Sequence, residues 1–278
     1  MRLIYENERG KITMCGGGQK EWNITQIKGI SLPETDVSAV RYPYMAGQMV
    51  TRANITERYI TISGDVRDKT RKQLSRAANI FSAPGTLYIT AFAKTKKISV
   101  RCMSFEPGQS KGVFVPFTVQ FCADYPFFED LYETATELNS REKRLASPFV
   151  LKCAFSDRIL KNNVVNRGDV PAEPVLEIYS LLGAKCPYGI TVKNLHTGKS
   201  FTLNTDISAK ELITVDVKKR KIISNQRGNI LPCLNEFSEL SEFTVEAGVC
   251  TLEVVTKEIS GELQVVCKHT NNYVSADV

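Results

Sequence analysis

Histidine and tryptophan are scarce in this chain, whose 278 residues include only His196, His269 and Trp22 of these two types. A metal site or a catalytic triad that depends on histidine would have to use one of the two histidines. The motifs His-Glu-x-x-His and Gly-x-Ser-x-Gly are both missing, which removes the signals of a zinc protease and of a hydrolase nucleophile elbow. We therefore expect no catalytic residues, no metal site and no cofactor.

Close cysteine pairs and long hydrophobic runs are missing as well. No two of the eight cysteines lie two to four residues apart, so the spacing of a zinc site is absent. Their long, irregular spacing does not suggest a disulfide scaffold, and we interpret them as small hydrophobic residues in a reducing compartment. The sequence offers no transmembrane run, and Glu6 and Glu8 interrupt the N-terminus before a signal peptide can form.

The net positive charge comes from one half of the chain. The net charge is +6, and residues 1–146 hold 21 basic and 15 acidic residues, while the remainder is neutral. A basic half can bind nucleic acid or an acidic protein. Because the excess is small and no nucleic-acid-reading motif accompanies it, we interpret it as a solvated basic face and expect no sequence-specific nucleic-acid binding.

The N-terminal half combines strands with one helix. Alternating apolar residues predict strands at 58–63, 86–92, 98–102 and 117–122, the second and third of which form a hairpin. A helix follows the first strand, with Asp68 as its expected N-cap and Pro84-Gly85 as its stop. The expected apolar stripe of this helix is Leu74, Ala77, Ala78 and Phe81. Residues 1–146 are therefore expected to form an α+β domain with an antiparallel sheet.

The C-terminal half contains only short strands. They are predicted at 176–179, 189–192, 199–203, 212–217 and 249–255, with turn signals between them. This pattern is typical of a β-sandwich or jelly roll, which we place at residues 147–278. The charged segment 131–146 is expected to connect the two domains and to be partly helical. Residues 263–267 either complete the sandwich or return to the first domain.

Several segments together resemble distal tail proteins of long-tailed, non-contractile bacteriophages or prophages. In the N-terminal half they are Arg58-x-Ile60-x-Ile62-x-Gly64, Phe81-Ser82-Ala83-Pro84-Gly85 and the closing segment Phe121–Phe128. In the C-terminal half they are Asn166-Arg167-Gly168-Asp169, the hairpin Asn194-x-x-Thr197-Gly198-Lys199, Ile213–Asp216 and Gly228-Asn229. Lys199 departs from the family pattern, which has Glu there. The order and spacing of these segments carry the resemblance.

The resemblance implies a structural protein of the virion tail tip, made in the cytoplasm of the bacterial host. It implies a hexameric ring of N-terminal domains, single or double, with galectin-like C-terminal domains pointing outward. The ring would join the tail tube protein to the tail-associated tip protein and to receptor-binding or other baseplate proteins. DNA would pass through the central channel without being read, and no membrane insertion is implied.

The candidate ring interface consists of exposed-looking aromatic and basic residues. A closed ring uses head-to-tail contacts, so two different patches of one subunit must fit each other. The candidates are Tyr42 and Tyr44 in an aromatic, proline-containing loop, and Arg67, Arg71 and Lys72 on the basic helix face. The alternative is that the two tyrosines cover the domain's own core.

The alternative function is a carbohydrate-binding accessory module that aids host adsorption. Galectin-like folds bind sugars by stacking a ring on an aromatic side chain, usually tryptophan, but the single tryptophan lies in the other half of the chain. The residues left for stacking are Tyr179, Tyr188 and Phe201. Fold alone does not confer this function.

Overall fold

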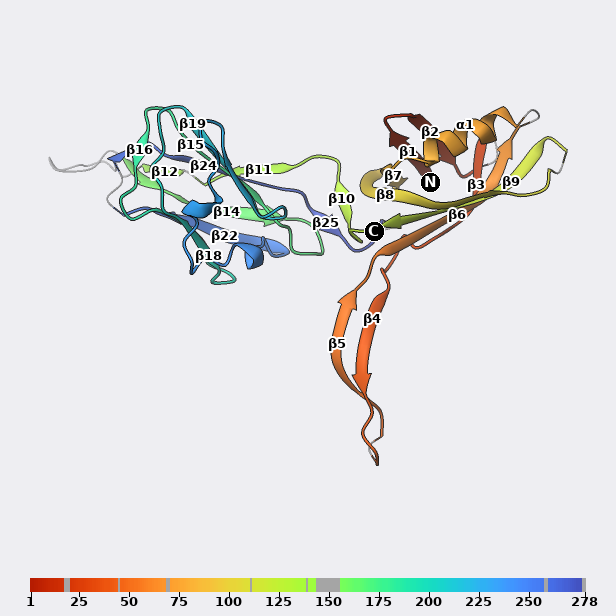
Figure 1. The fold of residues 1–278 in the computed structure, drawn as a ribbon, viewed down its shortest axis with the longest axis horizontal. Helices are drawn as coiled ribbons and strands as arrows, with labels where there is room; N and C mark the ends of the chain where they lie inside the picture. Colours follow the sequence, from red (N-terminus) through yellow and green to blue (C-terminus); the bar gives the residue numbers. More distant parts are fainter. Residues whose placement is uncertain are drawn as a thin grey trace. The chain divides into compact units, whose positions relative to one another are not determined.

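The chain folds into two compact units that consist mostly of strands (Figure 1). The computed structural model describes residues 1–17, 21–44, 46–68, 71–110, 112–138, 140–143, 156–257 and 260–276. Unit 1 comprises Met1–Leu131 with Tyr273–Val278, and unit 2 comprises Tyr132–Asn272. The expectation of a mostly-β protein is confirmed, while the domain boundary expected after residue 146 falls outside the described residues.

Unit 1 is built on a nine-stranded sheet that closes on itself. The strand order is β25-β10-β8-β7-β1-β2-β3-β6-β9, and a further pairing of β8 with β9 joins the run into a ring of strands. The strands are β1 (Arg2–Asn7), β2 (Gly10–Cys15), β3 (Trp22–Lys28), β6 (Arg58–Arg67), β7 (Gly85–Ala91), β8 (Lys94–Pro107), β9 (Phe114–Ala123), β10 (Phe128–Asp130) and β25 (Asn272–Tyr273). The pairing of β2 with β3 is parallel, so the antiparallel sheet expected from the sequence has one exception.

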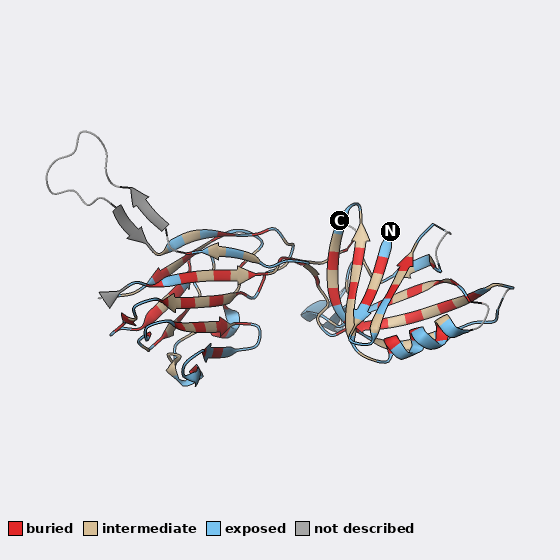
Figure 2. Ribbon diagram, turned by 90° about the horizontal axis from the view of Figure 1, so that it is seen from above, coloured by how far each residue is buried: buried red, intermediate tan, exposed pale blue. Residues whose placement is uncertain are grey.

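The sheet encloses the core because apolar residues alternate along its strands. Every second residue of β6 is buried, and the same alternation is visible along the neighbouring strands in Figure 2. Aromatic rings fill the interior: the rings of Tyr5 and Phe121 stack at 5.1 Å, and Phe81 meets Tyr5 edge-on at 5.3 Å. Trp22 packs against Phe117 at 4.9 Å. The one tryptophan is thus part of this core.

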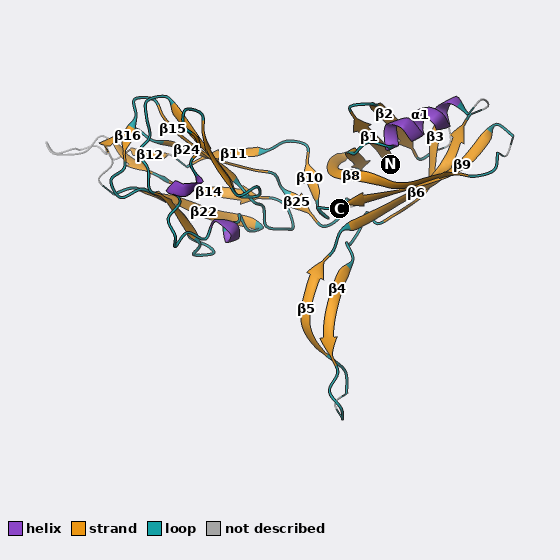
Figure 3. Ribbon diagram, in the orientation of Figure 1, coloured by secondary structure: helices purple, strands orange, loops and turns teal. Residues whose placement is uncertain are grey.

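Helix α1 (Lys72–Phe81) lies beside the closed sheet of unit 1 (Figure 3), and its buried side chains belong to this core. The expected helix is confirmed, but its buried face differs by one position: Ala78 is exposed and Ile80 is buried. Asp68 lies outside the helix, yet its Oδ2 accepts a hydrogen bond from the backbone N–H of Leu74 at 3.0 Å. The carboxylate therefore satisfies a free amide of the first turn, as an N-cap does.

The turn between β7 and β8 is tighter than the sequence suggests. Ala91 pairs with Lys94, so only Phe92 and Ala93 form the loop, and both have positive φ angles, 47° and 65°. This is the geometry of a two-residue hairpin turn that glycine or asparagine usually occupies. Without those residues the turn was expected at 94–97, which in fact begins β8.

Unit 2 consists of two main sheets around one core. The six-stranded sheet has the order β11-β24-β15-β19-β20-β21, and the four-stranded sheet has the order β14-β22-β17-β18. Their inward residues, among them Val164, Phe201 and Val265, belong to one buried cluster. The strands are β11 (Thr134–Glu137), β14 (Lys161–Asn166), β15 (Val175–Ser180), β17 (Ile190–Asn194), β18 (Ser200–Leu203), β19 (Glu211–Asp216), β20 (Lys221–Ser224), β21 (Gly228–Asn229), β22 (Gly248–Val255) and β24 (Gln264–His269).

Shorter elements complete unit 2. They are two strand pairs, β12 (Ser140–Lys143) with β13 (Ser156–Ile159) and β16 (Ala184–Lys185) with β23 (Ser260–Gly261), and two 3-10 turns, Leu231–Cys233 and Leu240–Glu242. The segment expected as a partly helical connection instead contributes β11, which pairs with β24. Its sequence, Thr-Ala-Thr-Glu, alternates half-buried threonines with exposed residues, and β11 lies at the edge of the sheet. Among the described residues no helix is long and apolar enough to cross a membrane.

The end of the chain serves both units in succession. β24 pairs with β11 and β15 and so completes a sheet of unit 2, which resolves the two alternatives left open for residues 263–267. The chain then returns to unit 1, where Tyr273 to Ala276 lie against residues that include Lys96 and Ile30.

Candidate functional site

A two-stranded arm projects from the closed sheet of unit 1 and carries the predicted tyrosines. It is formed by β4 (Thr35–Val40) and β5 (Met49–Ile55), which pair only with each other and are exposed along their whole length (Figure 1). Tyr42 and Tyr44 lie in the loop at its tip, Tyr42 half exposed and Tyr44 fully exposed. Neither tyrosine covers the core of unit 1, so the alternative reading of these residues is wrong.

The arm has one apolar and one polar face. The register pairs Thr35 with Ile55 and Val37 with Ala53, so these side chains share a face. A bulge in the register then pairs Ala39 with Val50, which continues the same face. The exposed fractions of Val37, Val50 and Ile55 are 46%, 52% and 48%. An apolar strip of this kind, unpacked on a lone hairpin, is typical of a surface that another protein covers.

The polar face alternates with the apolar one. It carries the pairs Asp36–Asn54 and Ser38–Arg52. Neither strand was predicted, because Thr-Asp-Val-Ser-Ala-Val contains small and polar residues that obscure the two-residue period. The apolar positions Val37, Val50 and Ile55 were the available signal.

The buried side chain of Arg58 anchors the root of the arm. Its Nη1 donates to the carbonyl oxygens of Gly29 at 2.8 Å and Ser31 at 3.1 Å, which lie just before β4. Its Nε donates to the carbonyl of Pro126 at 2.6 Å, and its Nη2 donates to the carbonyl of Val274, also at 2.6 Å. Backbone carbonyls from three separate segments thus converge on one guanidinium.

The same root requires a glycine. Gly29 has a φ angle of 84°, and a Cβ at this position would lie 1.9 Å from the carbonyl oxygen of Tyr59. A side chain cannot be accommodated in that contact. The chain therefore leaves β3 for the arm in close contact with the start of β6.

The predicted basic residues lie elsewhere on unit 1. Arg67 ends β6, Arg71 precedes α1 with a φ angle of 56°, and Lys72 begins the helix; all three are exposed. In Figure 1 the arm leaves the sheet on the side away from α1. The three basic residues therefore lie where β6 ends and α1 begins, whereas Tyr42 and Tyr44 lie at the tip of the arm.

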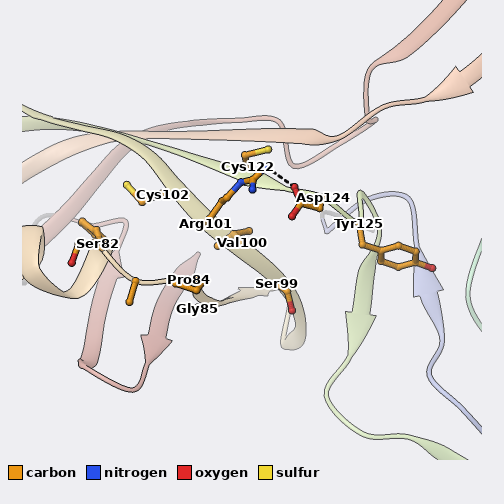
Figure 4. A pocket seen from close by; sticks show the side chains of 12 residues that line it. Ser82, Pro84, Gly85, Ser99, Val100, Arg101, Cys102, Cys122, Asp124 and Tyr125 are labelled. Atoms are coloured by element: carbon orange, nitrogen blue, oxygen red, sulfur yellow. Dashed lines mark hydrogen bonds and ion pairs between the residues drawn. The ribbon is translucent and has the colours of Figure 1, made fainter. Parts of the chain in front are cut away.

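A shallow hollow lies beside the C-terminal end of α1 (Figure 4). It has a volume of about 610 Å³ and is lined by residues 81–85, 99–102, 122, 124 and 125. Arg101 and Asp124 form an exposed ion pair of 2.8 Å there. Burial raises the pKa of the Cys102 thiol to about 11, so that it is protonated at neutral pH and is a poor nucleophile.

Unit 2 also contains buried thiols. The thiols of Cys186 and Cys267 are buried, and desolvation raises their pKa values to about 11 and about 12. The described residues contain no group of three or more histidine, cysteine or acidic side chains placed to hold a metal ion. Phe201 is fully buried and so cannot stack on a sugar, whereas Tyr188 is exposed and Tyr179 is half-buried.

Two motifs noted in the sequence serve the backbone. The Asn166 side chain donates to the carbonyls of Val170 and Val245, both at 3.0 Å, and accepts from the amide of Gly168 at 2.9 Å. Asn194 likewise donates to the carbonyl of Thr244 at 2.7 Å. Both buried side chains hold backbone groups of neighbouring segments and so fix the shape of loops.

His269 gives unit 2 a predicted sensitivity to acid. The ring is buried, Nε2 lies 3.2 Å from the carbonyl oxygen of Val165, and Nδ1 has no partner among the described residues. Burial, the largest cause, lowers the pKa of His269 below its usual 6.5. The neutral ring therefore stabilises the fold fully above about pH 6.5, and this stability declines as the pH falls toward the folded-state pKa.

We expect the substitution His269→Gln to remove this part of the pH dependence, because the glutamine amide keeps a donor for Val165 but does not titrate. The measurement is the urea concentration at which β24 unfolds. Hydrogen exchange of its amides detects this midpoint at several pH values between 7.5 and 5. The exposed His196→Gln is the matched control and should follow the unmodified chain. Parallel curves for His269→Gln and the unmodified chain would contradict the expectation.

Two solved structures share this fold, although no protein-family model and no curated protein matches the sequence. The crystal structure of SPP1 Dit (gp 19.1), described as a paradigm of the hub adsorption apparatus in phages that infect Gram-positive bacteria, aligns with a TM-score of 0.65 at 10% identity over 90% of this chain and 92% of that one. A chain of the phage P2 baseplate in its activated, calcium-bound conformation aligns with a TM-score of 0.50 at 11% identity over 97% of both chains. The resemblance to distal tail proteins is thereby confirmed in the fold: the chain has the architecture of SPP1 Dit along nearly its whole length.

Proposed function

We propose that this protein is a non-enzymatic structural component of a phage tail tip, where copies of it assemble into a closed ring. The fold shared with SPP1 Dit and with a chain of the phage P2 baseplate supports a place in a tail hub or baseplate. Fold likeness alone does not fix function. The observation that carries the proposal is therefore the exposed arm of this chain.

The arm is better suited to contact another copy of the chain than to remain exposed to water. Two-stranded hairpins are marginally stable alone in water, and this one pairs with no other strand of the described chain. Its apolar face, with Val37, Val50 and Ile55, gains stability only when another surface covers it. In a ring, each arm would lie on the neighbouring copy, with Tyr42 and Tyr44 at its tip as further contacts.

The basic residues are candidates for a second patch of the ring. Arg67, Arg71 and Lys72 lie on another part of unit 1 than the arm, as head-to-tail contacts require. Six copies are expected from the sequence resemblance, and the central opening would let DNA pass. One or two such rings meet this description.

Unit 2 is proposed to act as a galectin-like β-sandwich for docking. Its two main sheets share one buried core, and its buried asparagines fix loops rather than a ligand. The proposed partners of the whole ring are the tail tube protein, the tail-associated tip protein and receptor-binding or other baseplate proteins. The burial of Phe201 removes one of the three aromatic residues considered for sugar binding, so the lectin alternative has less support.

The test is the mass and shape of the purified full chain. Native mass spectrometry and negative-stain images at micromolar concentration should show closed annular particles, with six copies as the expected number. A chain that stays monomeric up to high concentration would overturn the ring. A substrate turnover abolished by one side-chain change would overturn the structural role.

A further inference from the structure

The last described residues of the chain fasten the arm to unit 1. Ala276 donates its backbone N–H to the carbonyl of Ile30 at 3.0 Å, and the Ser275 hydroxyl donates to the same carbonyl at 3.4 Å. Val274 offers its carbonyl to Arg58 at 2.6 Å. Residues 273–276, which we call the strap, thus contact both roots of the arm: the segment 29–34 before β4 and the segment 56–58 after β5.

The two roots are also joined to each other through the residue that holds the strap. The guanidinium of Arg58 binds the strap at Val274 and the first root at Gly29 and Ser31 simultaneously. Thr56 closes the base of the arm, because its amide donates to the carbonyl of Glu34 at 3.1 Å. Removing the strap would therefore leave the guanidinium and the carbonyl of Ile30 with fewer partners in a buried place.

A third set of contacts holds the strap without touching the arm. The buried Lys96 donates to the carbonyl of Ser275 at 2.8 Å, and its ammonium lies 3.9 Å from the centre of the Tyr273 ring. The Tyr273 hydroxyl lies 3.2 Å from a carboxylate oxygen of Asp130. Lys96 and Asp130 pair across β8 and β10, so the strap rests on the sheet at this point.

We propose that the strap is a conformational lock for the arm, so that the arm is held in place only while residues 273–276 are seated. The strap follows directly on Asn272, whose carbonyl accepts a hydrogen bond from the amide of Asp169 in unit 2 at 2.8 Å. The strap therefore begins directly after a residue that is hydrogen-bonded within unit 2. The lock would thus control the position of the arm, which goes beyond the proposed ring itself.

The experiment measures hydrogen exchange of the full chain at a dilution at which it is monomeric, so that its result is independent of the ring. Lys96→Met removes the donor to the Ser275 carbonyl and the charge beside the Tyr273 ring, and it leaves the donors to the roots, which are Arg58, Thr56 and Ala276, in the chain. We expect exchange to rise at least tenfold in the strap and also in residues 29–34 and 56–58, with β7 unchanged. Lys94→Met, at an exposed position of the same strand, is the matched control and should change none of these rates.

Two outcomes overturn the lock. The first is faster exchange in the strap of Lys96→Met while both roots keep their original rates. If Lys96→Met leaves the hydrogen-exchange rates of the strap unchanged, a chain that ends at Asn272 and therefore lacks the strap is measured instead. The second overturning outcome is that exchange at the roots of the shortened chain is unchanged while β7 is still protected. Faster exchange at the roots, with β7 still protected, supports the lock.

Discussion

Lysine at both Val37 and Ile55 is expected to dissociate the ring while leaving the fold of unit 1 intact. Both side chains are about half exposed in the single chain, so their replacement should change its free energy of unfolding by no more than about 0.5 kcal/mol. About half of each side chain remains to be buried, so each substitution would lose roughly half of the 1.5–3 kcal/mol of a full apolar burial in the assembly. A combined loss of about 1.5–3 kcal/mol per contact raises the dissociation constant roughly 10- to 100-fold, which sedimentation at micromolar concentration would detect.

The opposite face of the arm supplies a control with the same charge. Ser38 and Asn54 lie one residue along each strand from Val37 and Ile55 and belong to the polar face. Lysine at both of these positions adds the same two charges to the same strands. The ring of this second variant should persist. Rings in both variants, or in neither, would contradict the assignment of the apolar face as the contact surface.

The parts of the fold that the sequence predicted are those in which burial and periodicity agree. In β6 the residues Ile60, Ile62 and Val66 face the core, so the two-residue alternation could be recognised in the sequence. Helix α1 was found from its three-to-four residue spacing for the same reason, although Ile80 replaces Ala78 in its buried face. The five strands predicted in unit 2 follow the same rule: β15, β17, β18, β19 and β22 lie within two residues of their predicted places, whereas β14 and β20 were not predicted.

The parts that the sequence did not predict lack such a pattern in their own residues. The arm buries nothing within the single chain, so selection for a two-residue period is weak there, and Val37, Val50 and Ile55 stand among polar neighbours. The strap was missed because its contacts join Val274 to Arg58 across 216 positions of the chain. The motif containing Arg58 was recognised, yet nothing in the sequence shows that its partners are backbone carbonyls.

The candidate site was half predicted for a related reason. Tyr42 and Tyr44 stood out as aromatic residues in a proline-containing loop, and the structure places both at the exposed tip of the arm. The apolar strip behind them required the register of β4 and β5, which a bulge after Ser38 shifts by one residue. A register of this kind depends on pairing geometry and not on the spacing of residues along one strand.

Replacement of Arg58 by methionine is expected to be the most damaging single change in unit 1. Four carbonyls, of Gly29, Ser31, Pro126 and Val274, would lose their donor in a buried place. Leaving such groups unpaired costs about 1–3 kcal/mol each, partly offset because a charge no longer needs to be buried. We expect a net loss of about 3–5 kcal/mol in the free energy of unfolding, measured by urea denaturation of the full chain.

The charge of Arg58 explains why lysine is not an adequate substitute. Burial lowers the pKa of the guanidinium to about 10, so the group remains charged at neutral pH, and it stacks 4.7 Å from the centre of the Phe128 ring. An ammonium has three donors at one point and cannot span three separate segments as the planar guanidinium does. Arg58→Lys should therefore fall between the unmodified chain and Arg58→Met. The control is Arg101→Met, which breaks an exposed ion pair and should lower the free energy of unfolding by less than about 1 kcal/mol. If Arg58→Met lowers it by no more than this control, the convergence of carbonyls at the root of the arm contributes little to stability.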